Sequence, residues 1–237
     1  MILHTESFGK GVEAIVFLHS GLQTGLSDFE YQRNYFKEHY RIILPDLRGH
    51  GDSVSTELDN IFERNAQDLA ETLDQLGIET AHIVGASFGA LVGIVFAKRF
   101  PSKVKSLAIS GVTAEQPDNW EQLREQEARN QQQIFEYEET NAYFDQLHKG
   151  DWRKLIALGQ QRDWYPFEET KDLSAIAAPI LYLAGEGNPN ETKGVQYYPD
   201  KYDHVHVSVI PFASHLVHAE QAELHAKTFE LFLSRID

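Results

Sequence analysis

The sequence predicts an α/β fold, in which a mostly parallel sheet is flanked by helices and a helical segment is inserted between two strands. Six apolar runs rich in β-branched residues predict the strands, at 13–19, 40–46, 80–86, 104–110, 179–185 and 205–211. Most of these runs are continuous and not alternating, which is typical of strands buried on both faces. Helical patterns lie between several of them. This repetition of strand and helix predicts parallel pairing, with ligands bound beyond the carboxyl ends of the strands.

The clearest helical pattern lies between the second and third predicted strands. The apolar residues that would share one helix face there are Ala66, Leu69, Ala70, Leu73 and Leu76. Gly77 follows this pattern directly, and a glycine at that place is the usual residue for ending a helix. The sequence therefore predicts a helix that packs one face on the sheet and ends before Gly77.

A segment without strand signals interrupts the alternation between residues 113 and 178. A structureless loop of that length is improbable in a compact protein, so we expect an inserted helical cap. The segment has seven Lys or Arg against fourteen Asp or Glu. Its nine aromatic residues are Trp120, Phe135, Tyr137, Tyr143, Phe144, Trp152, Trp164, Tyr165 and Phe167. The predicted domains are a core of residues 1–112 and 179–237 and a cap of residues 113–178.

Composition excludes several classes of function. The net charge of −15 over 237 residues argues against nucleic acid and anionic membrane surfaces as partners. The absence of cysteine excludes disulfides, thiolate catalysis and Cys-ligated metals. The amino-terminal residues lack the basic and apolar regions of a signal peptide, and no apolar stretch approaches 18 residues. We therefore expect a cytoplasmic protein with a small-molecule substrate, while the oligomeric state stays open.

Ser87 is the strongest candidate for a reactive group. It lies in the motif G-A-S-F-G, directly after a predicted strand and directly before a helical pattern. A serine on such a tight turn adopts strained backbone angles, and Gly85 and Gly89 allow strand and helix to approach closely. The alternative is a glycine-rich turn whose serine only caps the helix. Further motifs in the chain favour the reactive role.

Four motifs together resemble those of the α/β-hydrolase superfamily. They are H-S-G at residues 19–21, D-L-R-G-H-G-D-S at 46–53, G-A-S-F-G at 85–89 and A-S-H-L at 213–216. The resemblance covers the chain outside the predicted cap. It implies an eight-stranded type of α/β-hydrolase sheet, with helices on both faces. Arg48 and His50, in the second motif, are expected to shape a loop and not to take part in chemistry.

The resemblance also implies roles for single residues. Ser87 would be the nucleophile and His215 the general base. The backbone N–H groups of Phe88 and Gly21 would form the oxyanion hole, with Leu22 as an alternative to Gly21, because Ser20 replaces the usual glycine of this turn. In the family, the acid follows the strand here predicted at 179–185, and Asn188 occupies its position.

Asn188 leaves three readings of the third catalytic position open. The triad could be Ser87, His215 and Asn188; a displaced carboxylate could serve His215; or hydrolysis could be lost and a binding pocket kept. The candidate carboxylates are Glu186, Glu191 and Glu115. We take Asn188 as the predicted partner, and we expect slow catalysis because an uncharged amide stabilises an imidazolium poorly.

The predicted function is a serine-dependent, carboxylesterase-like hydrolase acting on a small ester or related carbonyl compound through an acyl-enzyme. A C–C hydrolase or lyase of the same fold is an alternative. Its substrates are usually anionic, and Arg124, Arg153 and Arg162 could bind them. A non-hydrolytic ligand-binding protein is another. No cofactor is expected, and no metal either, since His204 and His206 lack an obvious third ligand.

Overall fold

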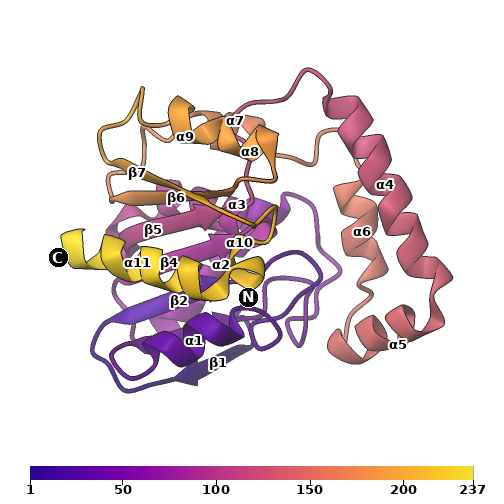
Figure 1. The fold of residues 1–237 in the computed structure, drawn as a ribbon. Coiled ribbons are helices and arrows are strands. Elements are labelled where there is room, and N and C mark those ends of the chain that lie inside the picture. The colour runs from indigo at the N-terminus through magenta and orange to yellow at the C-terminus, as the bar shows by residue number, and fades with distance from the viewer. Residues whose placement is uncertain (237) are drawn as a thin grey trace.

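A computed structural model describes residues 1–236 of the chain and contains one seven-stranded sheet (Figure 1). The strands are β1 (Thr5–Phe8), β2 (Ala14–Leu18), β3 (Arg41–Pro45), β4 (Ala81–Ala86), β5 (Val104–Ser110), β6 (Ile180–Gly185) and β7 (Val205–Ile210). Their order in the sheet is β1-β3-β2-β4-β5-β6-β7. All pairs are parallel except that of β1 with β3.

The predicted α/β fold class is confirmed, and all six predicted strands are present within about one residue of their expected bounds. The described residues contain one strand fewer than the eight-stranded type implied by the resemblance. β1, which the sequence did not predict, lies at the edge of the sheet and pairs only with β3. The short strand TESF is only partly buried and therefore lacks the apolar run that marked the others.

Helices cover both faces of the sheet. The helices of the described residues are α1 (Glu30–Phe36), α2 (Ile61–Gln75), α3 (Phe88–Arg99), α4 (Trp120–Glu136), α5 (Glu138–Leu147), α6 (Arg153–Gly159), α7 (Phe167–Lys171), α8 (Pro189–Thr192), α9 (Gly194–Tyr197), α10 (Val217–Glu220) and α11 (Ala222–Ile236). α1 and α11 lie together on one face, and α2 and α3 lie on the other (Figure 1). The helix predicted around residues 66–76 is α2, and it ends before Gly77, which has φ 67°.

The alternation of side chains along buried strands divides the core into two layers. In β2, Ile15 and Phe17 pack with Phe229 of α11, while Val16 and Leu18 belong to the layer that contains α2 and α3. Every residue of β2 is buried. Burial on both faces explains why the sequence of this strand is a continuous apolar run.

The strandless segment predicted at 113–178 is helical, since it contains α4 to α7. α4, α5 and α6 lie to one side of the sheet (Figure 1). The segment bonds to the loops that follow β2 and β3, and its own first residue, Thr113, comes shortly after β5. His148 Nε2 lies 3.0 Å from the carbonyl oxygen of Leu22, Lys149 N–H donates to Gly51 at 3.0 Å, and Thr113 N–H donates to Tyr165 at 2.7 Å. These helices are therefore attached at the carboxyl ends of the strands.

Candidate active site

Ser87 lies between β4 and α3 with φ 51° and ψ −116°. A positive φ is costly for a residue with a side chain and persists only where the surroundings enforce it. A methyl group on Gly85 would lie 2.5 Å from the carbonyl oxygen of Gly89, and one on Gly89 would lie 2.1 Å from that of Leu18. The two glycines are thus required by close backbone contact, and the predicted strained turn is confirmed.

His215 lies in the loop after β7 and meets Ser87. Its Nε2 is 2.8 Å from Ser87 Oγ, a hydrogen-bonding distance. Gly111, at the end of β5, makes this approach possible, because a methyl group there would lie 3.1 Å from Ser87 N and 3.2 Å from His215 Cε1. Gly111 has φ 68° and was not singled out from the sequence. Its only sequence signal is a glycine directly after a buried strand.

The third partner is Glu191 and not Asn188. Glu191 Oε1 lies 2.6 Å from His215 Nδ1. An ionised carboxylate only accepts hydrogen bonds, so this contact places the proton on Nδ1 and leaves Nε2 free to accept from Ser87. Glu191 is buried, with 2% of its surface exposed. Of the three carboxylates considered, Glu186 instead accepts the N–H of Phe212, and Glu115 is exposed.

Asn188, predicted as the partner of His215, has a different role. It is the N-cap of α8, and its Oδ1 accepts the N–H groups of Asn190 and Glu191 at 3.2 and 3.4 Å. Its Nδ2 donates to Glu191 Oε1 at 2.6 Å. Pro189 is the first residue of α8, and the turn of this helix brings Glu191 back beside Asn188. The spacing Asn-Pro-x-Glu is typical of a helix N-terminus, and this signal, which the sequence analysis did not use, places the carboxylate three residues after Asn188.

Glu220 holds the peptide on both sides of His215. Its carboxylate accepts the N–H of Ser214 at 2.7 Å and that of Leu216 at 2.9 Å. Sequence reasoning missed this residue, whose only signal is an acidic side chain five positions after the histidine. The loop is therefore fixed by a bidentate contact, which limits rotation of the His215 backbone.

The pKa values of the His215–Glu191 pair reflect both burial and pairing. Desolvation alone would lower the pKa of His215, but the hydrogen bond and charge of Glu191 outweigh it and raise the pKa above 6.5. Burial raises the pKa of the Glu191 carboxyl, against the opposing effect of His215. The arrangement therefore favours a charged imidazole once a proton reaches it.

Two backbone groups predicted to bind an oxyanion lie beside Ser87. Phe88 is the first residue of α3, so its N–H has no acceptor within its own helix. Gly21 follows β2, and a methyl group on it would lie 3.8 Å from Phe88 Cβ. The next residue, Leu22, has φ 62°, and its carbonyl oxygen lies 3.0 Å from His148 Nε2. The structure thus brings Gly21 and Phe88 together next to Ser87.

Arg48 and His50 lie in the buried loop after β3. Arg48 makes a bidentate contact with Asp68, with distances of 2.7 and 3.0 Å. The His50 ring lies 5.3 Å from that of Phe88, and burial lowers the pKa of its imidazole well below 6.5. Both residues are engaged within the protein, as expected for loop-shaping residues. Over residues 1–236 no group of three or more His, Asp or Glu is arranged to hold a metal ion.

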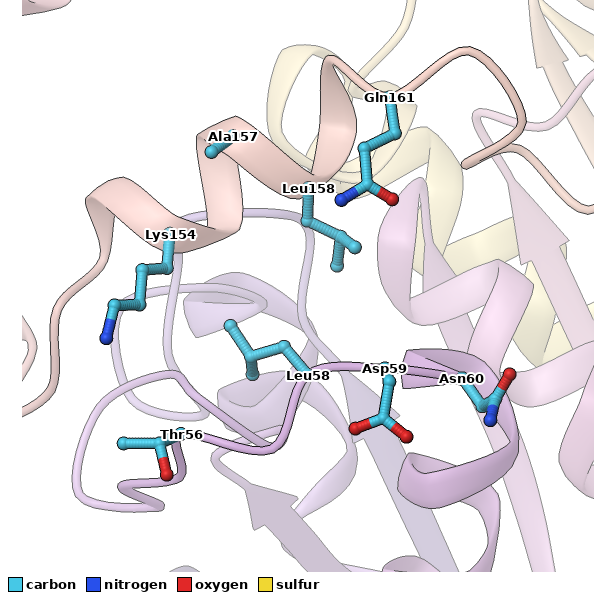
Figure 2. Close-up of a pocket in the computed structure, with 8 residues that line it drawn as sticks. All are labelled: Thr56, Leu58, Asp59, Asn60, Lys154, Ala157, Leu158 and Gln161. Atoms are coloured by element: carbon cyan, nitrogen blue, oxygen red, sulfur yellow. The ribbon is translucent and has the colours of Figure 1, made fainter.

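An open cleft lies between the loop that precedes α2 and helix α6 (Figure 2). Its volume is about 520 Å³. Leu58 of the loop points toward α6, and Lys154 and Leu158 of α6 point toward the loop (Figure 2). Neither Ser87 nor His215 lines this cleft.

Comparison with known proteins identifies the family of the chain. Residues 13–155, more than half of the chain, match the family described as alpha/beta hydrolase fold. The chain belongs to this family. Within the described residues, no helix is both long and apolar enough to cross a membrane.

Relatives in the family differ in their named activities. The chain is 28% identical to 3-oxoadipate enol-lactonase 1 of Acinetobacter baylyi, with 96% of this chain and 91% of that protein covered. It is 37% identical to 2-hydroxy-6-oxononadienedioate/2-hydroxy-6-oxononatrienedioate hydrolase of Burkholderia vietnamiensis over 113 residues, which are 46% of this chain and 39% of that protein. The latter match thus spans about two fifths of the relative's length.

Solved structures share the fold. NosK from Streptomyces actuosus superposes with a TM-score of 0.82 at 23% identity, covering 94% of this chain and 98% of NosK. Naproxen esterase from Bacillus subtilis superposes with a TM-score of 0.72 at 21% identity, covering 97% and 87%. At these identities the likeness establishes the fold, and the function has to be argued from the site.

Proposed function

We propose that this protein is a serine hydrolase that cleaves a small ester or lactone through an acyl-enzyme on Ser87. The observation that carries the proposal is the continuous chain of hydrogen bonds from Ser87 Oγ to His215 Nε2 at 2.8 Å and from His215 Nδ1 to Glu191 Oε1 at 2.6 Å. Nucleophile, base and orienting acid in this geometry, on a strained strand-to-helix turn, are the arrangement that acyl transfer requires.

The chemistry follows from the contacts. His215 Nε2 takes the hydroxyl proton as Ser87 Oγ attacks the carbonyl carbon, and Glu191 stabilises the imidazolium that forms. The N–H groups of Phe88 and Gly21 bind the oxyanion of the tetrahedral intermediate. The imidazolium then protonates the leaving alcohol as the acyl bond to it breaks. Water, deprotonated by His215, releases the acid from Ser87 by the reverse sequence of steps.

C–C hydrolysis is the second candidate, because the relative from Burkholderia is named for a dioate substrate, which carries two carboxylates. Charge argues against such a substrate here. Arg124 and Arg162 both pair with Glu121, and Arg153 pairs with Asp145. The three arginines that could have formed an anion clamp are thus engaged within an acidic segment. A neutral ester or lactone fits this charge distribution better.

The test uses p-nitrophenyl esters of short acids together with an organophosphate probe. We expect hydrolysis by the wild-type protein, loss of hydrolysis in Ser87→Ala, and one covalent adduct, located on Ser87 by mass spectrometry. A ring-fission product with two carboxylates is tested in parallel as the C–C substrate. Absence of both activities and of the adduct would favour a non-hydrolytic binding protein. Adduct formation at another residue would contradict the assigned nucleophile.

A further inference from the structure

Ser20 departs from the usual glycine of its turn, and its contacts explain the departure. The backbone N–H and the hydroxyl of Ser20 both donate to Asp28 Oδ2, at 2.8 and 2.9 Å. Asp28 lies in the loop before α1 and is 8% exposed. A glycine would keep the first of these bonds and lose the second. The serine therefore adds a hydrogen bond between the turn that carries Gly21 and a buried carboxylate.

The other oxygen of Asp28 reaches the segment that carries His215. Asp28 Oδ1 lies 2.6 Å from Nε2 of His218, which is 2% exposed and belongs to α10. His218 follows His215 by three residues. One carboxylate thus bonds both to the turn after β2 and to the segment after β7, although Asp28 and His218 are 190 residues apart in the chain.

Packing fixes the position of Asp28 independently of these bonds. The next residue, Phe29, has φ 52°, which is unfavourable for a bulky side chain and persists only where the surroundings impose it. Its ring stacks on His218 at 4.2 Å and lies 5.0 Å from the ring of Phe17 in β2. Phe29 N–H also donates to Asp28 Oδ1 at 3.2 Å. Asp28 is therefore held in place by the core.

The carboxylate of Asp28 is ionised at neutral pH. Burial alone would raise its pKa, but the hydrogen bond and charge of His218 and the two bonds from Ser20 lower the pKa well below the usual range. A buried charge that accepts this many hydrogen bonds resists displacement, because moving it leaves several polar groups unsatisfied.

We propose that Asp28 is a positioning residue that fixes the oxyanion-binding turn relative to His215. The inference rests on the proposed function. Nucleophilic attack requires the proton acceptor and the oxyanion donors to surround one carbonyl group at the same moment, so their mutual distance matters more than the position of either alone. Asp28 contacts both segments and is placed to set that distance without touching substrate.

Two variants separate positioning from general stability. Asp28→Asn removes the charge at nearly constant size, and Ser20→Gly removes only the hydroxyl and restores the residue usual for this turn. Ser106→Ala is the matched control, because Ser106 is also buried and its hydroxyl lies 2.8 Å from Nδ1 of a histidine, His82. Both residues lie near the start of their strands, β5 and β4, whereas Ser87 follows the end of β4. Unfolding in urea gives the stability of each variant.

The readout is the separation of kcat from KM on a p-nitrophenyl ester. We expect kcat of Asp28→Asn to fall by up to about 10²-fold with KM nearly unchanged, since a displacement of about 1 Å has this effect on positioned groups. Ser20→Gly should lower kcat by a smaller factor, and the double variant should resemble Asp28→Asn because both changes act through the same carboxylate. Ser106→Ala should keep its kcat.

Two outcomes would overturn the role of Asp28. One is an unchanged kcat in both Asp28→Asn and Ser20→Gly. The other is that Ser106→Ala loses as much kcat as Asp28→Asn for the same loss of stability in urea. Should Asp28→Asn not fold, Ser20→Gly alone decides by the same criterion. Failure of the proposed function is distinguishable, because the wild-type protein would then show neither ester hydrolysis nor an adduct on Ser87.

Discussion

At the scale of the residue, the site depends on which side chain hydrogen-bonds to Nδ1 of His215. Glu191 is buried and makes its contact through Oε1, which also accepts the amide of Asn188. The amide donates toward the carboxylate and so helps to stabilise its negative charge. Asn188 is thus a support for the acid and not a replacement for it, and this division of roles leads to two predictions.

The first prediction concerns Glu191→Gln. Loss of the charge should lower kcat/KM for esters by about 10³- to 10⁴-fold, as when the acid of a triad becomes an amide. The residual activity should also change its pH dependence. Catalysis needs neutral His215, whose pKa Glu191 raises, so removing the carboxylate should move the acidic limb of the pH–rate profile to lower pH. An unshifted limb would mean that another group supports the imidazole.

The second prediction concerns Asn188→Asp. A carboxylate at this position would face Glu191 Oε1 across 2.6 Å, so one of the two would take up a proton. We expect kcat/KM at neutral pH to fall by about tenfold or more, since 1.4 kcal/mol of repulsion already corresponds to that factor. Asn188→Ser, which keeps a capping oxygen without charge, serves as control and should lose less activity. Faster hydrolysis by Asn188→Asp would contradict the assignment of Glu191.

At the scale of the element, the sequence predicted the parts that depend on local pattern. The six predicted strands, the end of α2 at Gly77 and the turn at Ser87 follow from apolar runs and from glycines with specific steric roles. It did not predict β1, whose four residues carry no buried run. The contact of Asp28 with His218 also could not be read from spacing, because it joins segments that only the tertiary fold brings together.

The choice between Asn188 and Glu191 shows the same limit within a single turn. A family pattern placed the acid by counting residues after β6. The local helix that Pro189 starts moves the carboxylate one helical turn further along the chain, back toward His215. The position of the acid therefore depends on this local helix and not on the number of residues after β6. The spacing Asn-Pro-x-Glu is the one feature of the sequence that indicates the helix.

A third prediction concerns His148, which joins the inserted helices to the core. It follows α5, its Nδ1 accepts the N–H of Gly51 at 2.9 Å, and its Nε2 lies 3.0 Å from the carbonyl oxygen of Leu22. His148→Ala should leave the buried N–H of Gly51 unsatisfied, at a cost of about 1–3 kcal/mol in the free energy of unfolding. It should also lower kcat, because Leu22 adjoins the oxyanion-binding turn.

The control for His148→Ala is Asn141→Ala, which removes bonds from Asn141 Nδ2 to three carbonyl groups at the junction of α4 and α5. This variant weakens the inserted helices without touching the turn after β2. Stability in urea and kcat for a p-nitrophenyl ester are measured for both variants. Equal kcat in the two variants would show that His148 serves only to hold the helices in place.

At the scale of the whole molecule, the core contains buried histidines whose side chains are neutral in the folded protein. Burial lowers the pKa of His19, His50 and His148, and it lowers the pKa of His225 to about 3. Such groups take up protons in the unfolded chain below about pH 6.5 and resist doing so in the native protein. His215 acts in the opposite sense, because its pKa is raised, but it is a single group.

The last prediction is that the protein loses stability as the pH falls from 7 to 5. In this interval the unfolded chain binds more protons than the native state, so the free energy of unfolding falls as the pH falls. By pH 5, each histidine with a strongly lowered pKa contributes a loss of about 2 kcal/mol. His225→Leu should therefore reduce the difference in unfolding free energy between pH 7 and pH 5 by about 2 kcal/mol, measured by urea denaturation at both pH values. His39→Gln, at an exposed position, should leave that difference unchanged. Since His225 is 1% exposed and lies where α11 faces α1, beside Phe29 and Gln32, the comparison tests protonation of a buried core histidine. An equal loss of stability in His225→Leu and wild type would show that the acid sensitivity arises at other groups.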